Sequence, residues 1–501
     1  MSPVGTSRAY NEPDLFNYFR TYVAPEIAGA FDQEYWLGNL LRQAQSEPVV
    51  WHTCNAIAAA HKMDRIGICD KASLVGEQKS LSLQPYEQYH AAIQHMKHIV
   101  PQPDLSLEQK RNVALVSLLF TIFAFMRGDL EDCNAHTMAS WSLVDTWKLW
   151  EQTRLYRPRD RHSVHPADSL IYLCVRIETI GNHIRQPSHK YEYGWTGCSL
   201  KLRDDPFISV TEAYFEMELI CNAATDITVR PGPKSVKFTP SEIAGAEDLR
   251  GRYRARLTKW QGKFGSLQPS CGEDDKLALA ILELRAAMMR TIVFTEDALA
   301  VSELCWDSCT AEFARMIGMA KDILAMRYAA TGQNANAPPA RKPSHRSRRR
   351  TLAIGPMVNE TLYLIVRLCR DPVVRRRALA LLAHDFHLSP GIDTLLYIHM
   401  GDAIRAEEER EWDTKQQQQQ QQQQLEGKGI VGSSSPCGCS RRQTRICDGH
   451  RVCSSCLDCP TRNSAVLCVK TVECVNRDGA WRRIPLHYGS YNPELTPLFE
   501  I

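Results

Sequence analysis

The feature that most constrains the fold is a helical pattern between Ser106 and Gly128 whose second part is almost entirely apolar. Ser106 and Gln109 have the spacing of a capping box, residues 113–126 are almost entirely apolar, and Gly128 supplies a left-handed stop. This pattern predicts one helix that other helices must cover on every side. Its apolar part is shorter than the roughly 18 residues that a membrane span needs. We therefore expect a central core helix with no catalytic group.

Apolar residues spaced three and four apart predict further helices on both sides of this one. Short joints between consecutive helices predict antiparallel neighbours. Longer polar stretches, such as 150–165 and 186–205, interrupt the pattern, and we treat them as insertions or partner-binding surfaces. Near the C-terminus, two apolar runs flank Asp478-Gly479, which predicts a β-hairpin.

The predicted fold class is therefore all-α, an antiparallel, repeat-like bundle of many helices with long loops and a small C-terminal β-hairpin. The predicted parts are a large helical domain (1–330), a basic, proline-rich linker (331–351), C-terminal helices of the same domain (352–412), a glutamine-rich spacer (413–436) and a cysteine-rich segment with the hairpin (437–501). The glutamine run at 416–424 cannot bury a core, so we expect a flexible spacer there.

The overall charge is nearly balanced, so any strongly charged binding surface must be local. Lys and Arg number 60 and Asp and Glu 57, a net charge of +3, so no bulk charge attracts the whole chain to nucleic acid or membrane. One patch is strongly basic and comprises Arg341, Lys342, Arg346, Arg348, Arg349 and Arg350. It is typical of a nuclear-localisation signal or a phosphate contact. The alternative is a solvated loop that balances acidic neighbours.

Cysteines gather at the C-terminal end. Because no charged-then-apolar leader follows Met1, we expect reduced thiols inside the cell rather than a disulfide framework. Cys447, Cys453, Cys456 and Cys459 include overlapping Cys-x2-Cys pairs, the spacing that a tetrahedral zinc site uses. The second pair of such a site is missing downstream. Structural zinc and reduced thiols in a partly disordered segment both remain open, and no other cofactor is expected.

Several short stretches carry a resemblance to a known family. They are Tyr18-Phe19-Arg20, Phe31-Asp32, Trp36, Glu47-Pro48, Ala56, Ala58, His61, Tyr89, Ala92-Ile93, residues 118–128, Cys369-Arg370-Asp371-Pro372, residues 375–379 and Glu473-Cys474-Val475. With them the chain resembles the regulatory, middle homology region of fungal binuclear zinc-cluster transcription factors. The resemblance implies an all-helical nuclear regulator, often tied to a secondary-metabolite gene cluster.

The sequence departs from that family at its DNA reader. Members usually begin with six cysteines, Cys-x2-Cys-x6-Cys repeated, which hold two zinc ions and present a basic helix to DNA. The first cysteine here is Cys54, inside a predicted apolar helix. We therefore expect a regulator that lacks its own zinc-cluster reader.

Three functions remain open. The first is a nuclear transcription regulator that contacts other regulators or a DNA-bound protein, with indirect or weak DNA contact, no membrane association and homo-oligomerisation left open. The second is direct DNA binding, through residues 346–350 or through a cluster whose exon is missing from the gene model. The third is a metabolic enzyme. The sequence contains no phosphate-binding glycine loop, Gly-x-Ser-x-Gly elbow or His-Glu-x2-His helix, so we predict that the protein is not an enzyme.

Overall fold

The central apolar helix forms where its caps predict. In the computed structural model, α6 spans Leu107–Arg127, and the Ser106 hydroxyl accepts from the Gln109 amide while the Gln109 side chain accepts from the Ser106 amide. Gly128 ends the helix in the left-handed region at φ 73°. Residues 112–126 are all buried. The predicted covering by other helices is confirmed, because α6 packs against α4 (Pro48–Ile66) and α7 (Leu130–Thr146).

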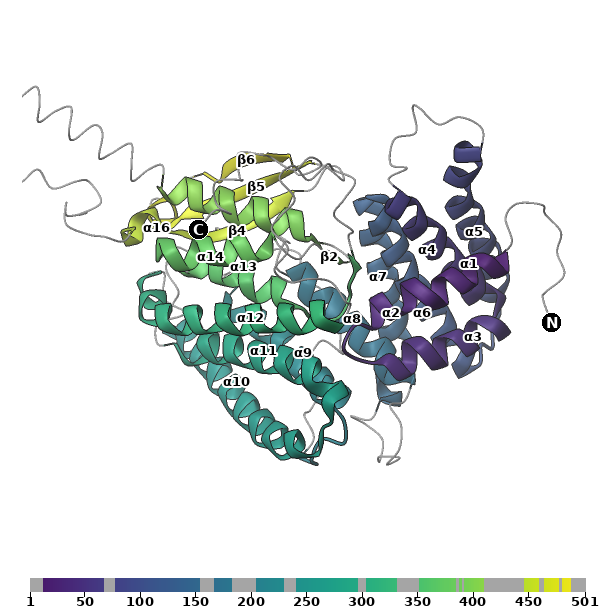
Figure 1. Ribbon diagram of the computed structural model, residues 1–501, viewed down its shortest axis with the longest axis horizontal. Coiled ribbons are helices and arrows are strands. Elements are labelled where there is room, and N and C mark those ends of the chain that lie inside the picture. Colours follow the sequence, from purple (N-terminus) through teal and green to yellow (C-terminus); the bar gives the residue numbers. More distant parts are fainter. Residues whose placement is uncertain are drawn as a thin grey trace, which may run out of the picture.

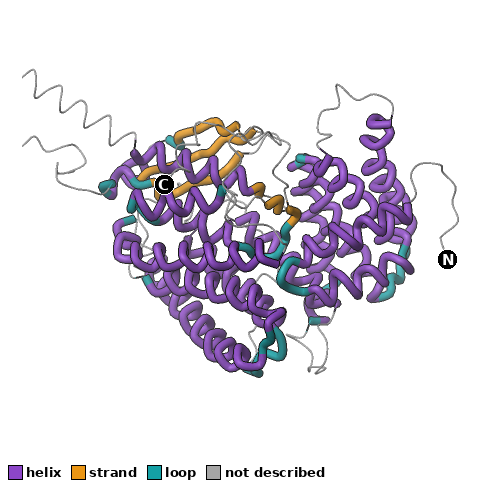
Figure 2. The backbone as a smooth tube through the Cα atoms, viewed as in Figure 1, coloured by secondary structure: helices purple, strands orange, loops and turns teal. Residues whose placement is uncertain are grey.

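The structure describes residues 12–66, 77–153, 166–182, 204–228, 240–295, 303–330, 351–383, 387–389, 392–409, 446–458, 464–476 and 480–487. Helices make up most of them, and the strands lie towards the C-terminal end of the chain (Figure 2). The prediction of an all-α fold with a small C-terminal β element is confirmed. Within these residues, the apolar stretch of each helix falls short of what a bilayer crossing requires.

The N-terminal bundle surrounds α6. Its other members are α1 (Glu12–Tyr18), η1 (Phe19–Val23), α2 (Ala24–Ala28), η2 (Tyr35–Asn39), α3 (Leu40–Ser46), α5 (Glu77–Ile99) and η4 (Leu149–Gln152). Pro25 does not break the first helical run, because η1 is a π-helical turn that delivers the chain into α2 with the proline in its first turn.

The chain from residue 166 onwards forms another helical body beside this bundle. It comprises α8 (Pro166–Asn182), α9 (Val210–Thr228), α10 (Pro240–Leu267), η6 (Gln268–Ser270), η7 (Glu273–Asp275), α11 (Lys276–Phe294), η8 (Leu304–Cys309), α12 (Thr310–Ala330), α13 (Val358–Leu368), α14 (Pro372–Leu382) and a helix at 394–409. In Figure 1 these helices, teal and green, lie beside the purple and blue bundle, with α8 at the junction.

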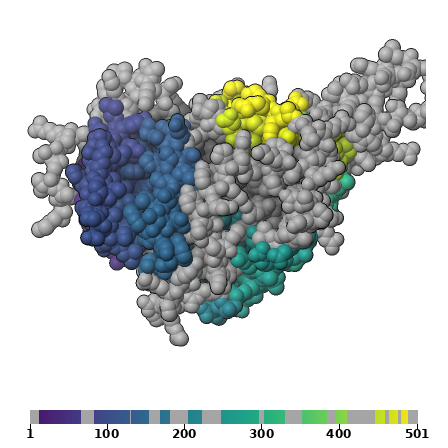
Figure 3. Space-filling view, turned by 180° about the vertical axis from the view of Figure 1, so that it is seen from behind, coloured from purple at the N-terminus to yellow at the C-terminus, as the bar shows by residue number. Residues whose placement is uncertain are grey.

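Two small sheets complete the described fold. β1 (Thr351–Leu352) pairs in parallel with β2 (His387–Ser389), which pairs antiparallel with β3 (Ile392–Asp393). β4 (Val452–Asp458), β5 (Ser464–Thr471) and β6 (Arg482–His487) form an antiparallel sheet in that order. We call β4, β5 and β6 the C-terminal sheet. Its residues are coloured yellow on the face shown in Figure 3.

The predicted hairpin corresponds to β5 and β6, with two additions. The short helix α16 (Val472–Asn476) follows β5, and β4 adds a third strand on the other edge of β5. The preceding turn is η9 (Asp448–His450).

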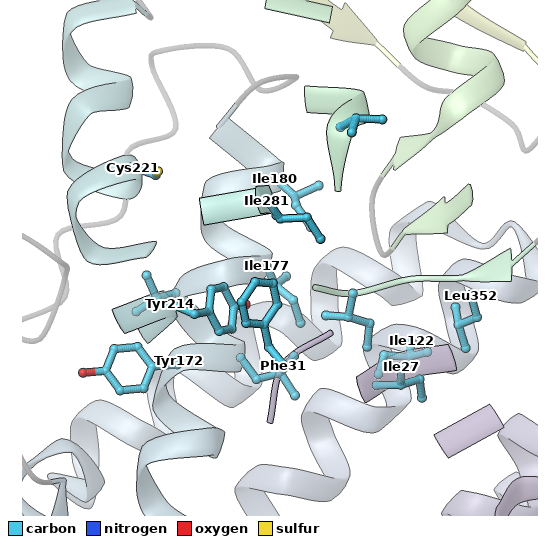
Figure 4. Packing of buried hydrophobic residues seen from close by; sticks show 14 of the residues in the cluster. Ile27, Phe31, Ile122, Tyr172, Ile177, Ile180, Tyr214, Cys221, Ile281 and Leu352 are labelled. Carbon is cyan, nitrogen blue, oxygen red and sulfur yellow. The ribbon is translucent and has the colours of Figure 1, made fainter. Parts of the chain in front are cut away.

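The core is continuous between the two helical bodies. Phe31, on the loop after α2, stacks on Tyr214 of α9 with ring centroids 4.5 Å apart (Figure 4). Leu352 of β1 is buried in the same cluster. Contacts between residues so distant in the chain tie the N-terminal bundle to the second body.

Candidate functional site

The basic patch predicted from the sequence is not among the residues that the structure describes. Arg341, Lys342, Arg346, Arg348, Arg349 and Arg350 lie outside the described residues, between the end of α12 and the start of β1. Their role as a nuclear-localisation signal or phosphate contact stays a prediction.

The predicted zinc ligands are only partly described. Cys447 Sγ lies 2.8 Å from His450 Nδ1, Cys453 Sγ donates to the Lys470 carbonyl at 3.5 Å, and Cys456 faces Cys468 across β4 and β5. Cys459 lies outside the described residues. Among those that are described, no three or more His, Cys, Asp or Glu side chains converge as metal ligands. The zinc hypothesis therefore stays untested, and β4 gives two of its cysteines an ordered strand.

His61, one of the family-like residues, is a buried hydrogen-bonding group. Its Nδ1 lies 3.1 Å from the Tyr18 hydroxyl, and its Nε2 lies 3.0 Å from Glu26 Oε2. The same carboxylate oxygen accepts from the Leu352 amide at 2.8 Å. Burial raises the pKa of Glu26, but the bonds from His61 and Leu352 outweigh it and leave the pKa below its usual range. These contacts fasten β1 to the N-terminal bundle.

Asp32 occupies a strained position at the same junction. Its position before an apolar helical pattern favours a helix cap, but its carboxyl group accepts from the Ser169 hydroxyl at 3.0 Å, and its backbone has φ 53°. Its amide donates to the Thr211 hydroxyl at 3.3 Å. Burial raises the pKa of Asp32 to about 8, and nearby Asp168 adds to the effect despite the Ser169 bond. The side chain therefore joins the N-terminal bundle to α8 and α9.

Four charged side chains meet in the interior of the second body. We call Arg176, Glu218, Arg285 and Glu360 the central charge cluster; they come from α8, α9, α11 and α13. Arg176 donates to Glu360 at 2.8 Å and to Glu218 at 3.4 Å. Arg285 donates to Glu360 at 2.9 Å and to Glu218 at 2.7 Å. Two cations and two carboxylates balance, so the cluster is neutral and locks four helices together.

A second set of charges holds the C-terminal sheet to the helices. We call Glu303, Asp307, Arg370, Arg375, Glu408 and Arg451 the C-terminal charge cluster. Arg451 makes a bidentate pair with Asp307 at 2.9 and 2.8 Å. Glu408 Oε1 accepts from Arg370 at 3.0 Å and from the Val452 amide at 2.7 Å. Burial raises the pKa of Glu408, but Arg370 and Arg375 outweigh it and hold the pKa below its usual range.

Chemically, both clusters are suited to holding elements together. Each carboxylate of the central cluster accepts from two guanidinium groups, which hold it in place. A general acid or base instead needs a carboxylate that can reach a substrate.

A surface pocket of about 580 Å³ lies between α11, η8 and α12. It is lined by Ala287, Arg290, Thr291, Phe294, Thr295, Cys305, Ser308, Cys309, Glu312 and Arg315. The Thr295 hydroxyl and Cys309 Sγ lie 3.2 Å apart beside it. Its volume lies within the roughly 300–1,000 Å³ that is usual for small-molecule sites.

Sequence reasoning missed both clusters and the pocket. A usable signal was present in the helices: Arg176 follows Val175 and precedes Ile177, and Glu218 lies between Met217 and Leu219. A charge at an apolar position of a helix predicts a buried, paired group. The pocket has no comparable local signal.

Comparison with known proteins identifies one family. Residues 14–186 match the family model of the fungal specific transcription factor domain, a stretch that runs from α1 into the segment after α8. This match confirms the resemblance of that stretch to the regulatory region of fungal transcription factors. No curated protein and no solved structure matches the chain significantly.

Proposed function

We propose, with the fungal specific transcription factor domain in residues 14–186 as the premise, that the protein is a nuclear transcription regulator. It acts through protein contacts, with other regulators or a DNA-bound protein as partners. A role at a secondary-metabolite gene cluster is the finer form of this proposal.

The observation that carries the proposal is the family match over the N-terminal bundle and α8. The contacts of that stretch support a scaffold role, because its helices are fixed to the rest of the chain by Asp32, Arg176 and the Phe31–Tyr214 stack. A rigid helical surface of this kind is suited to holding a protein partner.

Direct DNA binding is the second candidate, and the cluster of arginines at 346–350 favours it. Binding led by phosphate contacts releases counterions, so its affinity falls steeply as salt rises and depends little on base sequence. An enzymatic role has less support, because the buried carboxylates of both charge clusters are engaged by arginines.

An electrophoretic mobility shift of the full chain on promoter DNA, across a salt series, separates these two functions. The partner mechanism predicts no sequence-specific complex from the purified chain alone. The arginine patch predicts a complex that weakens uniformly with salt and that is lost when Arg348, Arg349 and Arg350 are changed to Gln. A sharp, salt-resistant, sequence-specific complex would contradict the partner mechanism.

A further inference from the structure

The short helix η8 contacts two different parts of the molecule. On one side it meets the approach to the C-terminal sheet: Asp307 holds Arg451, the Glu303 carbonyl accepts from Arg451 at 2.9 Å, and the Glu303 amide donates to Asp448 at 2.7 Å. On the other side Cys305, Ser308 and Cys309 line the pocket against α11. The helix η8 therefore connects the wall of the pocket to the contacts that hold the C-terminal sheet.

Among the described residues that line it, the pocket has more cationic than anionic side chains. Its lining includes Arg290 and Arg315 and one carboxylate, Glu312, which pairs with Arg315 at 2.9 Å. Behind it, Arg254 donates to the Val293 carbonyl at 2.9 Å at the end of α11. Guanidinium groups favour carboxylate, sulfonate and phosphate oxygens as partners.

The pocket also offers an apolar surface. Phe294 is 44% exposed beside it, and Ala287 forms part of its wall. The Arg254 guanidinium lies 5.4 Å from the centre of the Phe294 ring, so this ring is held in place from behind. The combination suits a molecule with an anionic group and an apolar body.

We propose that a small organic anion with an apolar body binds between α11, η8 and α12, and that its binding changes the docking of the C-terminal sheet through η8. The ligand site adds a small molecule to the proposed regulatory function. Only the biological role of the ligand rests on that function. Its test needs neither promoter DNA nor a partner protein, so either idea can fail alone.

The first test uses two dyes with the same N-phenylnaphthylamine framework on the full chain. 8-Anilinonaphthalene-1-sulfonate carries the anionic group, and N-phenyl-1-naphthylamine lacks it. We expect saturable binding of the sulfonate at one site by titration calorimetry. The double change Arg290→Gln with Arg315→Gln should weaken the sulfonate about tenfold or more, equivalent to about 1.4 kcal/mol, and leave the neutral dye unaffected. Both arginines are exposed, so the fold should tolerate these changes.

Two further variants fix the location. Ser308→Trp, at an exposed lining position, should block both dyes by filling the pocket. Arg252→Gln removes an exposed arginine that pairs with Asp248 on α10 and does not line the pocket, so it should bind like the unchanged chain. Absence of saturable sulfonate binding, or equal binding by all variants, would overturn the site.

Hydrogen exchange tests the coupling. Saturating sulfonate should change the exchange of β4 and β5 amides in the unchanged chain and leave it unaltered in Ser308→Trp. Binding with no change in the exchange of these strands would overturn the link to the C-terminal sheet.

Discussion

At the residue scale, Asp32 makes stability depend on pH. Its pKa is raised to about 8 in the folded chain by burial, whereas an unfolded Asp titrates near its ordinary value of roughly 4. Between these values the folded state holds a proton that the unfolded state has lost. The free energy of unfolding therefore falls as pH rises through this window.

Asp32→Asn should remove this dependence. Asparagine keeps the shape, tolerates a positive φ and carries no charge, so we expect a gain of roughly 1–4 kcal/mol at about pH 8 that fades towards about pH 5. Urea unfolding at several pH values measures it. Asp104→Asn, at an exposed position, is the matched control and should show little change. A variant no more stable than the unchanged chain at the higher pH would contradict the assignment.

Single residues of the central charge cluster should also contribute strongly to stability. Glu360→Gln leaves the buried Arg176 and Arg285 with less compensating charge, and we expect a loss of about 3–5 kcal/mol of stability. Asp248→Asn, which breaks an exposed pair with Arg252, should cost less than about 0.5 kcal/mol. Chemical denaturation compares the two, and equal losses would show that the cluster is not the buried lock that its contacts indicate.

At the element scale, α6 depends on its caps. Gly128 has φ 73°, so Gly128→Ala should destabilise the chain by about 1 kcal/mol, because alanine is strained there. Gly251→Ala, on α10 where nothing lies within 4 Å of an added Cβ, should instead stabilise by roughly 0.5–1 kcal/mol. The same substitution thus has opposite signs at the two sites. Thermal unfolding of both variants measures this, and matching signs would refute the cap.

Helix starts and ends that are set by neighbouring residues could be predicted from the sequence. The caps of α6 and Pro372 in the first turn of α14 are signals carried by adjacent residues, and the two helices form at these places. Asp205-Pro206 favours a helix start, because proline is tolerated in the first turn of a helix. The helix α9 instead begins at Val210, where the Ser209 hydroxyl accepts from the Glu212 amide. That serine signal was present and missed.

Contacts between segments far apart in the sequence could not be predicted from local sequence patterns. Glu408 belongs to an acidic stretch before the glutamine run, and its burial against Arg370 and Val452 depends on segments that meet only in the folded chain. The pocket likewise depends on how η8 packs between α11 and α12. The candidate basic residues between 331 and 350 lie outside the described residues and rest on the sequence alone.

At the scale of the whole molecule, Arg451 is one of the residues that fasten the C-terminal sheet to the helices. Arg451→Gln removes the bidentate pair with Asp307, so we expect faster hydrogen exchange in β4 and β5, with α4 and α6 unchanged. Arg483→Gln, which breaks an exposed pair with Asp458 inside the sheet, is the control and should leave exchange nearly unaltered. Unchanged exchange in Arg451→Gln would mean that other contacts hold the sheet.

The proposed function of the whole protein can be tested with a reporter assay. The full chain can be fused to an unrelated DNA-binding domain and directed to a reporter promoter in a fungal cell, which replaces the DNA contact that we propose a partner supplies. We predict a several-fold change in reporter transcription, because the chain itself would carry the regulatory contacts. A folded, nuclear fusion that occupies the promoter and leaves transcription unchanged would contradict the proposal that this protein regulates transcription through protein contacts.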